Sequence, residues 1–203
     1  YEIRNCDWSS DVCSSDLKGL RYGGPKINAT HAGETFLDRV LGAIDGVRSE
    51  GDFVVVSLGD DTVVASAYGS QKAQVHFVRD AVSDAGPAHS MGRLAAFAIE
   101  NGSDDLVVTA VDMLGVTSDT LTCMRNEMRL DAGAAVVARH DASPHWVLNA
   151  VPRELLSRLA DNAASVNSLQ SLFNLMPLRF VDFPAQVVLD VNTPELLPRD
   201  GSG

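Results

Sequence analysis

Glycine and basic residues are concentrated in the stretch KGLRYGGPK, residues 18–26, and this composition suits phosphate binding. Glycines let backbone N–H groups approach phosphate oxygens closely, and a lysine adds a positive charge at the same place. The stretch is not a Walker loop, because Ile27 rather than serine or threonine follows Lys26 and the glycine spacing differs. It predicts a loop that holds a small phosphorylated ligand. The candidate ligand-binding residues are Gly19, Arg21, Gly23, Gly24 and Lys26.

Carboxylates follow two of the apolar runs that we expect to be strands. Asp80 comes directly after the run AQVHFVR, and Asp112 comes directly after the run over residues 106–111. Ligands of open α/β sheets bind beyond the carboxyl ends of the strands, where both side chains would lie. An aspartate there suits Mg²⁺, which takes one or two carboxylates together with water and substrate phosphates. Each residue also has a purely structural interpretation, because Asp80 can end a strand and Asp112 can cap the next helix.

The stretch DVNTPELL, residues 190–197, supplies two further polar side chains, Asp190 and Asn192. We expect it to converge on the same edge of the sheet as Asp80 and Asp112. Its segment Asn-Thr-Pro is also an ordinary helix start, with proline inside the first turn.

The elements that must position these residues alternate between strands and helices. One helix is expected from the apolar face that recurs between Phe36 and Val47, and another between Gly86-Pro87 and Asn101-Gly102. The other expected helices start near residue 117 or 118 and cover residues 153–162, 167–176 and 192–197. The expected strands cover residues 52–59, 73–80, 106–111, 132–140, 178–183 and 186–191. This alternation favours a three-layer α/β domain with a mainly parallel sheet.

Composition and charge narrow the class of protein. The chain has 203 residues, of which 45% are apolar, which is enough for one domain with a sizeable core. Its formal net charge of −11, with scattered basic residues, argues against a nucleic-acid partner. No apolar run is long enough to span a membrane, and we expect a cytoplasmic protein without a membrane partner. Cys123 is expected to pack on a helix face, and the five histidines have no metal-ligand spacing.

Residues 1–17 have no apolar period and no helix cap, and they are expected to be a non-native leader. The segment DVCSSDL, residues 11–17, equals one reading frame of a common sequencing-library adapter. We therefore expect the native sequence to start at Lys18.

In this order and spacing, the motifs resemble those of the molybdenum cofactor guanylyltransferases, nucleotidyltransferases of the glycosyltransferase-A-like fold. The family opens with Leu-Ala-Gly-Gly, three variable residues, Arg, a further residue, Gly and then Lys, and residues 18–26 are similar to it from the variable residues onward. GETFLDRVL is similar to the family's Gly-x-Thr-Leu-Leu-x-Arg-Val-Leu, and VVTAVDM to its Leu-Ala-Cys-Asp-Met. DVNTPELL is close to its Asn-x-Asn-Thr-Pro-Glu-Asp-Leu. The resemblance implies a domain over residues 18–197, with residues 198–203 as a polar tail.

The resemblance implies that GMP moves from GTP to molybdopterin or molybdenum cofactor, with release of pyrophosphate and with Mg²⁺ as cofactor. Lys26 and Asp112 are the implied catalytic residues, and Asp80 the implied nucleotide contact. Asp112 and Asn192 are the implied metal ligands. The acceptor side would have Asp190, Asn192 and His89, where the family carries a small residue in place of His89. Transient contact with cofactor-delivery proteins is also implied.

Three departures from the family pattern leave two alternatives open. Leu-Ala-Gly-Gly and its strand, expected to be central in the sheet, are missing, and Asp16 and Leu17 stand where the two glycines should fall. Leu114-Gly115 replaces the family's Pro-Leu, and residues 86–92 replace its Gly-Pro-Leu-Ala-Gly-Leu. One alternative is a cytidylyltransferase or another nucleotidyltransferase of the same fold. The second is a non-catalytic remnant that binds nucleotide.

Overall fold

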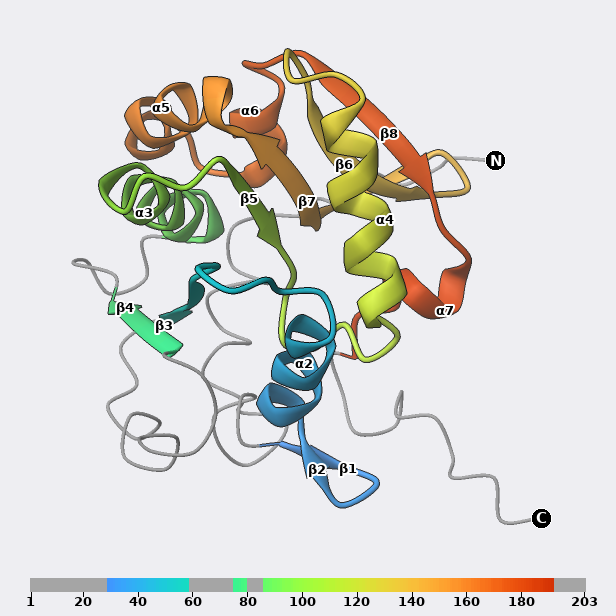
Figure 1. The fold of residues 1–203 in the computed structure, drawn as a ribbon. Coiled ribbons are helices and arrows are strands. Elements are labelled where there is room, and N and C mark those ends of the chain that lie inside the picture. The colour runs from blue at the N-terminus through green and yellow to red at the C-terminus, as the bar shows by residue number, and fades with distance from the viewer. Residues whose placement is uncertain (1–28, 59–74, 80–85, 192–203) are drawn as a thin grey trace.

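The computed structural model describes residues 29–58, 75–79 and 86–191. Within these residues, the strands form a four-stranded sheet of order β5-β7-β6-β8, a pair β3-β4 and a short hairpin β1-β2 (Figure 1). The strands of the large sheet are β5 Asp105–Val108, β6 Ala135–His140, β7 Ser143–Pro152 and β8 Leu178–Asp182. The others are β1 Thr30–His31, β2 Glu34–Thr35, β3 Val54–Leu58 and β4 Val75–Arg79.

Parallel and antiparallel pairs both occur among these strands. β3 pairs with β4 and β6 pairs with β8 in parallel, whereas β7 runs antiparallel to both of its neighbours, β5 and β6. The hairpin turns at Ala32 and Gly33, which both have positive φ, as a two-residue hairpin loop requires. The chain is therefore an α/β protein with parallel strands, as the sequence predicts.

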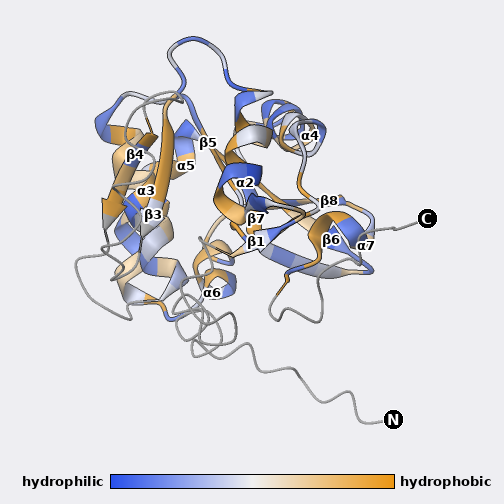
Figure 2. Cartoon of the chain, turned by 90° about the horizontal axis from the view of Figure 1, so that it is seen from below, coloured by the Kyte–Doolittle hydropathy of each residue, from blue (hydrophilic) through white to orange (hydrophobic). Residues whose placement is uncertain are grey.

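Helices cover both faces of the large sheet, which gives three layers (Figure 1). One layer holds α3 Pro87–Glu100, α5 Arg153–Asn162, the 3-10 turn η3 Ala163–Ser165 and α6 Leu169–Phe173. The opposite layer holds α2 Phe36–Asp45, α4 Ser118–Arg129 and α7 Ala185–Val188. Figure 2 shows hydrophobic residues along β5 and many hydrophilic residues on α4. This distribution is typical of an apolar sheet covered by amphipathic helices.

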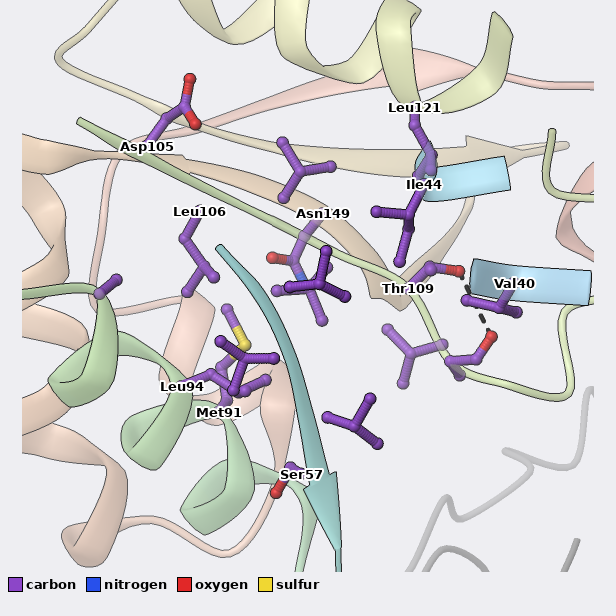
Figure 3. Close-up of a pocket in the computed structure, with 18 of the residues that line it drawn as sticks. Val40, Ile44, Ser57, Met91, Leu94, Asp105, Leu106, Thr109, Leu121 and Asn149 are labelled. Carbon is purple, nitrogen blue, oxygen red and sulfur yellow. Dashed lines mark hydrogen bonds between the residues drawn. The ribbon is translucent and has the colours of Figure 1, made fainter. Parts of the chain in front are cut away.

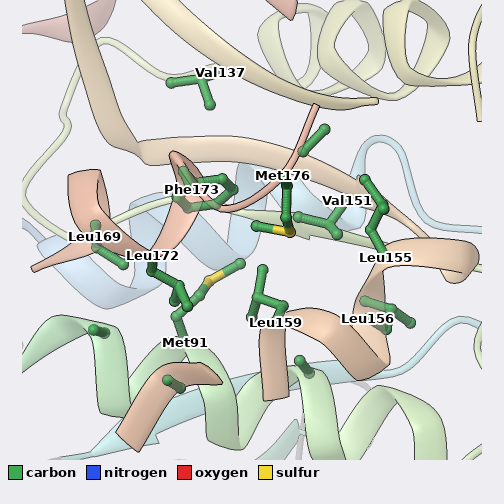
Figure 4. Close-up of a cluster of buried hydrophobic side chains, with 14 of the residues drawn as sticks. Met91, Val137, Val151, Leu155, Leu156, Leu159, Leu169, Leu172, Phe173 and Met176 are labelled. Carbon is green, nitrogen blue, oxygen red and sulfur yellow. The ribbon is translucent and has the colours of Figure 1, made fainter. Parts of the chain in front are cut away.

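The largest core cluster lies between the sheet and the layer of α3, α5 and α6 (Figure 4). Leu159, Leu172 and Phe173 have no exposed area, and Met91 on α3 packs against them. Each such side chain stabilises the fold by about 1.5–3 kcal/mol relative to exposure. A second cluster packs α4 and α7 against the other face of the sheet.

Capping residues set the helix starts that the sequence predicts. Thr117 caps α4, since its hydroxyl accepts from the N–H of Thr120 and the Thr120 hydroxyl accepts from the N–H of Thr117. Thr35 caps α2 by accepting from the N–H of Asp38 at 3.0 Å. Pro87 lies in the first turn of α3, where its missing N–H costs nothing.

The structure corrects the expected strands in three places. The strand expected over residues 186–191 is wrong, because Pro184 starts the helical turn α7 and an isolated bridge at Asp190 follows it. β7 was not expected, because Pro144 and Asn149 interrupt its apolar pattern. β5 also ends at Val108 rather than at Val111.

None of the helices in the described part of the chain is long and apolar enough to cross a membrane. The helix expected over residues 192–197 lies outside the described residues.

Candidate functional site

Asp112 lies in the turn that follows the carboxyl end of β5, and the fold brings Asp190 next to it. Met113 forms an antiparallel bridge with Asp190, and the N–H of Val191 donates to the carbonyl of Asp112 at 3.1 Å. Two carboxylates that are far apart in the sequence therefore occupy neighbouring positions. Both residues line the same large cavity, and Oδ1 of Asp190 is shielded from solvent.

Packing against α2 holds the turn that carries Asp112. Phe36, Leu114 and Val191 are all buried and form a small apolar cluster. Nε of Arg39 donates to the carbonyl of Leu114 at 3.1 Å. α7 also approaches this turn closely, because a Cβ added at Gly115 would overlap the backbone of Gln186. The backbone around the two carboxylates is therefore fixed from three elements.

The described residues enclose a cavity of about 1100 Å³ between the strand pair and the large sheet (Figure 3). Its walls are β3 on one side, β5 and β7 on the other, and α2 and α3 above and below. Most of the side chains that Figure 3 labels are apolar, and they come from α2, α3, α4 and β5. These apolar residues are Val40, Ile44, Met91, Leu94, Leu106 and Leu121.

Charged groups gather at the end of the cavity opposite Asp112. Arg125 of α4 donates from Nε to Asp105 at 3.1 Å and from Nη1 to Asp52 at 3.1 Å. Burial acts to raise the pKa of Asp52, but the hydrogen bonds from the Ser49 N–H and from Arg125 outweigh it and lower that pKa. The carboxylates at this end are thus already paired with a cation.

Two polar residues of β7 lie in the wall of the cavity. Burial, and secondarily the charge of His140, lowers the pKa of His145. Asn149 has no exposed area, and its Nδ2 donates to the carbonyl of Trp146 at 2.8 Å. A neutral imidazole and a carboxamide therefore face the interior on this side.

Of the residues singled out from the sequence, the structure brings together Asp112 and Asp190. His89 lies in the first turn of α3 and is half-buried, and it does not line the cavity, although its neighbour Ser90 does. The remaining candidates fall outside the described residues: Gly19, Arg21, Gly23, Gly24, Lys26, Asp80 and Asn192.

The donor set at Asp112 and Asp190 fits a hard divalent cation. Among the described residues, no group of three or more His, Cys, Asp or Glu side chains is arranged to hold a metal. Mg²⁺ needs no such cage, because it keeps several waters and takes one or two carboxylates with substrate phosphates. Asp112, with Asp190 beside it, could therefore hold a cation that a phosphorylated ligand shares.

Sequence reasoning missed Arg39 and Arg125. Arg39 bonds a carbonyl 75 positions away, and Arg125 bonds carboxylates 20 and 73 positions away. No local pattern signals such pairs, because they exist only after α2, α4 and the strands have packed.

Comparison with known proteins places this geometry in context. The family described as the MobA-like NTP transferase domain matches residues 18–179. The bifunctional protein GlmU of Nitrobacter hamburgensis is 31% identical over 125 residues, which are 62% of this chain and 27% of that protein. The match thus spans about a quarter of that relative's length.

Solved structures with the same fold include molybdopterin-guanine dinucleotide biosynthesis protein A from Archaeoglobus fulgidus. It has a TM-score of 0.64 at 18% identity, over 87% of this chain and 89% of that one. Rv0371c of Mycobacterium tuberculosis, solved as a complex with manganese, has a TM-score of 0.60 at 19% identity, over 84% and 88% of the two chains. The 4-diphosphocytidyl-2C-methyl-D-erythritol synthase of Anaerococcus prevotii has a TM-score of 0.63 at 13% identity, over 82% and 84%.

Proposed function

Since the chain belongs to the MobA-like NTP transferase domain family of nucleotidyltransferases, we propose that it transfers GMP from GTP to molybdopterin or molybdenum cofactor. In the proposed reaction, a phosphate oxygen of the acceptor attacks the α-phosphorus of GTP. The bond from that phosphorus to the bridging oxygen breaks, and pyrophosphate leaves. A phosphate nucleophile is already anionic near neutral pH, so the reaction needs positioning and charge neutralisation rather than a general base.

The observation that carries this proposal is the pairing of Asp112 and Asp190 beyond the carboxyl end of β5. The Met113–Asp190 bridge and the bond from Val191 to Asp112 fix the two residues in the wall of one cavity. This is the edge where α/β sheets bind nucleotides. A cavity of about 1100 Å³ is large enough for a nucleoside triphosphate and part of an acceptor.

Asp112 and Asn192 are the proposed ligands of a divalent cation, with Asp190 on the acceptor side. When bound, Mg²⁺ would neutralise phosphate charge. The manganese complex of Rv0371c, a protein of the same fold, supports a divalent cation as the cofactor. Lys26 and Arg21 would neutralise the triphosphate, Gly19, Gly23 and Gly24 would donate backbone N–H groups, and Asp80 would contact the nucleotide. His89, the third proposed residue of the acceptor side, does not line the cavity, so it would contact only an acceptor that extends beyond the cavity.

Pyrophosphate release tests the proposal. The full chain is incubated with GTP, Mg²⁺ and molybdopterin, and release is expected only when all three are present. Asp112→Asn and Lys26→Ala are each expected to lower kcat/KM by roughly tenfold to a hundredfold or more, because a charge-assisted contact contributes about 1.5–3 kcal/mol. Asp161→Asn, at an exposed position of α5, is the matched control and is expected to keep full activity.

A second candidate reaction is cytidylyl transfer. It is favoured by the structural similarity to the 4-diphosphocytidyl-2C-methyl-D-erythritol synthase of Anaerococcus prevotii. Thermal shift with Mg²⁺ and GTP, CTP or ATP separates the two, since the true donor is expected to stabilise the chain most by mass action. A larger shift with CTP than with GTP would overturn the guanylyl proposal.

The non-catalytic alternative makes a different prediction. A remnant that only binds nucleotide would show a thermal shift with GTP and Mg²⁺ but no pyrophosphate under any acceptor condition. Product formation that Asp112→Asn abolishes would exclude this alternative.

A further inference from the structure

β7 changes its pairing at Asn149. From this residue to its carboxyl end, β7 lies between β5 and β6 and pairs with both strands. Val137 of β6 pairs with Asn149, but the next residue of β6, Ala138, pairs with His145. Residues 146–148 of β7 therefore have no paired residue on β6, and the pairing with β5 also ends at Asn149. We name residues 146–148 the bulge.

The bulge keeps the amino half of β7 apart from the chain that follows β5. Val108 lies opposite Asn149, so regular pairing over four further residues would put His145 directly opposite Asp112. Paired strands are only about 4.8 Å apart, so this pairing would close the edge of the sheet beside Asp112. Instead, His145 pairs with β6, and the chain after β5 turns towards Asp190. The two segments separate because of the bulge.

The side chain of Asn149 ties the bulge to the regular part of β7. Its Nδ2 donates to the carbonyl of Trp146 at 2.8 Å, and this bond spans the whole bulge. Asn149 has no exposed area, and it lies in the wall of the cavity (Figure 3). A bond from a paired strand residue to the far end of the bulge sets the direction that the amino half of β7 takes.

Packing holds the bulge on both faces of the sheet. Leu148 has no exposed area and belongs to the core cluster of α4 and α7. Trp146 stacks on Phe173 of α6 with 6.0 Å between the ring centroids, and it meets Phe180 of β8 edge-on at 6.3 Å. The bulge is therefore an ordered part of the fold, and the surroundings of Trp146 report on its position.

Stability alone does not explain a carboxamide at position 149. Oδ1 of Asn149 is buried and has no hydrogen-bond partner among the described residues. Burial of an unpaired polar atom lowers the stability of the folded state. Leucine has the same branching as asparagine and would occupy the position without an unpaired acceptor. What the carboxamide adds is its bond to Trp146.

We propose that Asn149 is a positioning residue for the acceptor. By holding the bulge, Asn149 keeps residues 144–146 apart from residues 109–112, and the phosphate of the acceptor approaches Asp112 between these two segments. Both segments line the cavity. Asn149 acts through the backbone of Trp146 rather than through contact with the acceptor. The inference rests on the proposed function, because it assigns the residue that arranges the acceptor side of the same site.

The fluorescence of Trp146 tests this positioning without any reaction. The chain has two tryptophans, and Trp8→Phe leaves Trp146 as the only one. In this background, Asn149→Leu is expected to raise the acrylamide quenching constant of Trp146 at least about twofold, because the bulge loses the bond that holds its carbonyl. An unchanged quenching constant would overturn the proposal.

The matched control is Asn162→Leu. Nδ2 of Asn162 also donates to a backbone carbonyl, that of Arg158 at 2.7 Å, but this bond lies on α5 and away from the cavity. The control removes the same kind of bond, and it is expected to leave both the quenching constant and the kinetics unchanged. A control that behaves like Asn149→Leu would contradict a specific role of Asn149.

Steady-state kinetics test the effect on the acceptor. Asn149→Leu is expected to raise the KM for molybdopterin at least about tenfold and to leave the KM for GTP within about twofold of the parent value. A merely structural role would lower kcat through a smaller folded fraction and leave both KM values unchanged. That result, or an equal rise of both KM values, would refute the proposal.

The two measurements separate this inference from the proposed function. A parent chain that releases no pyrophosphate would refute the proposed function, and the quenching constant would then decide whether Asn149 positions Trp146. A parent chain that reacts, with changed quenching but an unchanged KM for molybdopterin in Asn149→Leu, would overturn this inference alone. Should Asn149→Leu not fold, Asn149→Ala, which also lacks the donor, takes its place. If neither variant folds while Asn162→Leu does, Asn149 is a structural residue and the proposal fails.

Discussion

β5 and β6 are neighbours of the same strand, β7, yet their environments differ. Residues 135–138 of β6 have no exposed area, whereas every residue of β5 is partly exposed. Both strands are short and apolar. The difference arises because β6 pairs on both edges, with β7 and β8, while β5 pairs only with β7 among the described strands. Burial of a strand is therefore decided by its neighbours as much as by its composition.

The same contrast extends to the helices. α3 packs a face of small residues against α5 and η3, where Gly92 lies against Ala163. α2 packs Leu37 and Leu41 in a smaller cluster with Val54 of β3, at the wall of the cavity. We call these two regions the packed half, with β6, β7, β8, α5, α6 and the face of α3 that contacts α5 and η3, and the open half, with α2, β3, β4 and the face of α3 that lines the cavity.

Truncating a leucine in each half should give the largest difference. Leu159→Ala is expected to lower the free energy of unfolding by about 2–5 kcal/mol, because it leaves a cavity in a filled core. Leu94→Ala, at a side chain that already lines the cavity, is expected to lower the free energy of unfolding by less than about 1.5 kcal/mol. Urea unfolding of both variants measures the difference. Equal losses would mean that the two halves are equally packed.

Removing the Arg125 ion pairs should lower the free energy of unfolding less than Leu159→Ala does. The loss should arise in the open half. Arg125→Met removes the cation that joins Asp52 to Asp105 and leaves Asp105 only its longer contact with Arg129 at 3.7 Å. It is expected to lower the free energy of unfolding by about 1–3 kcal/mol, since all three side chains are only partly exposed. Arg48→Met, which breaks the more exposed pair with Asp45, is expected to cost under about 0.5 kcal/mol.

The pH dependence of this bridge has a definite sign. Because the folded state lowers the pKa of Asp52, its stabilisation is complete above the usual carboxyl pKa of 3.8 and is lost as the pH falls through the lowered value. Thermal melts between about pH 5 and pH 2.5 should show a smaller loss in Arg125→Met than in the parent chain. Parallel curves would exclude the bridge as a source of acid lability.

Replacing a glycine by alanine should change the free energy of unfolding in opposite directions in the two halves. Gly92→Ala forces a methyl group against Ala163 and is expected to destabilise the chain by about 1–3 kcal/mol. Gly42→Ala, in α2 with nothing near the new Cβ, is expected to stabilise it by about 0.5–1 kcal/mol through helix propensity. Chemical denaturation of the pair compares them directly, and a shared sign would contradict the packing described for α3.

The smallest expected effect concerns His145 in the cavity wall. Its pKa is lowered from 6.5, so the unfolded chain takes up the proton first and stability falls as the pH drops below about 6.5. His145→Gln is expected to flatten this part of the stability curve between about pH 7 and pH 5. Identical slopes in the two proteins would show that His145 does not contribute.

Much of the fold could be predicted from local patterns. The starts of α3 and α4 follow from Pro87 and Thr117, because proline and a capping box act within one helical turn. β7 could not be predicted, since Pro144 and Asn149 hide its period and its strand state comes from pairing on both edges. The strand expected over residues 186–191 failed for the related reason that none of the described strands pairs with residues 185–188, which form α7.

The sequence by itself predicted the candidate site residues, namely the glycine- and lysine-rich stretch over residues 18–26 with Asp112 and Asp190, and it determined the alternation of strands and helices found in this nucleotidyltransferase family. These are properties of residue type and short spacing. Only the tertiary structure decided that Asp112 and Asp190 are neighbours, that Arg125 joins the segments at the starts of β3 and β5, and that a cavity separates those strands. Such contacts depend on the packing of distant segments, which no local pattern encodes.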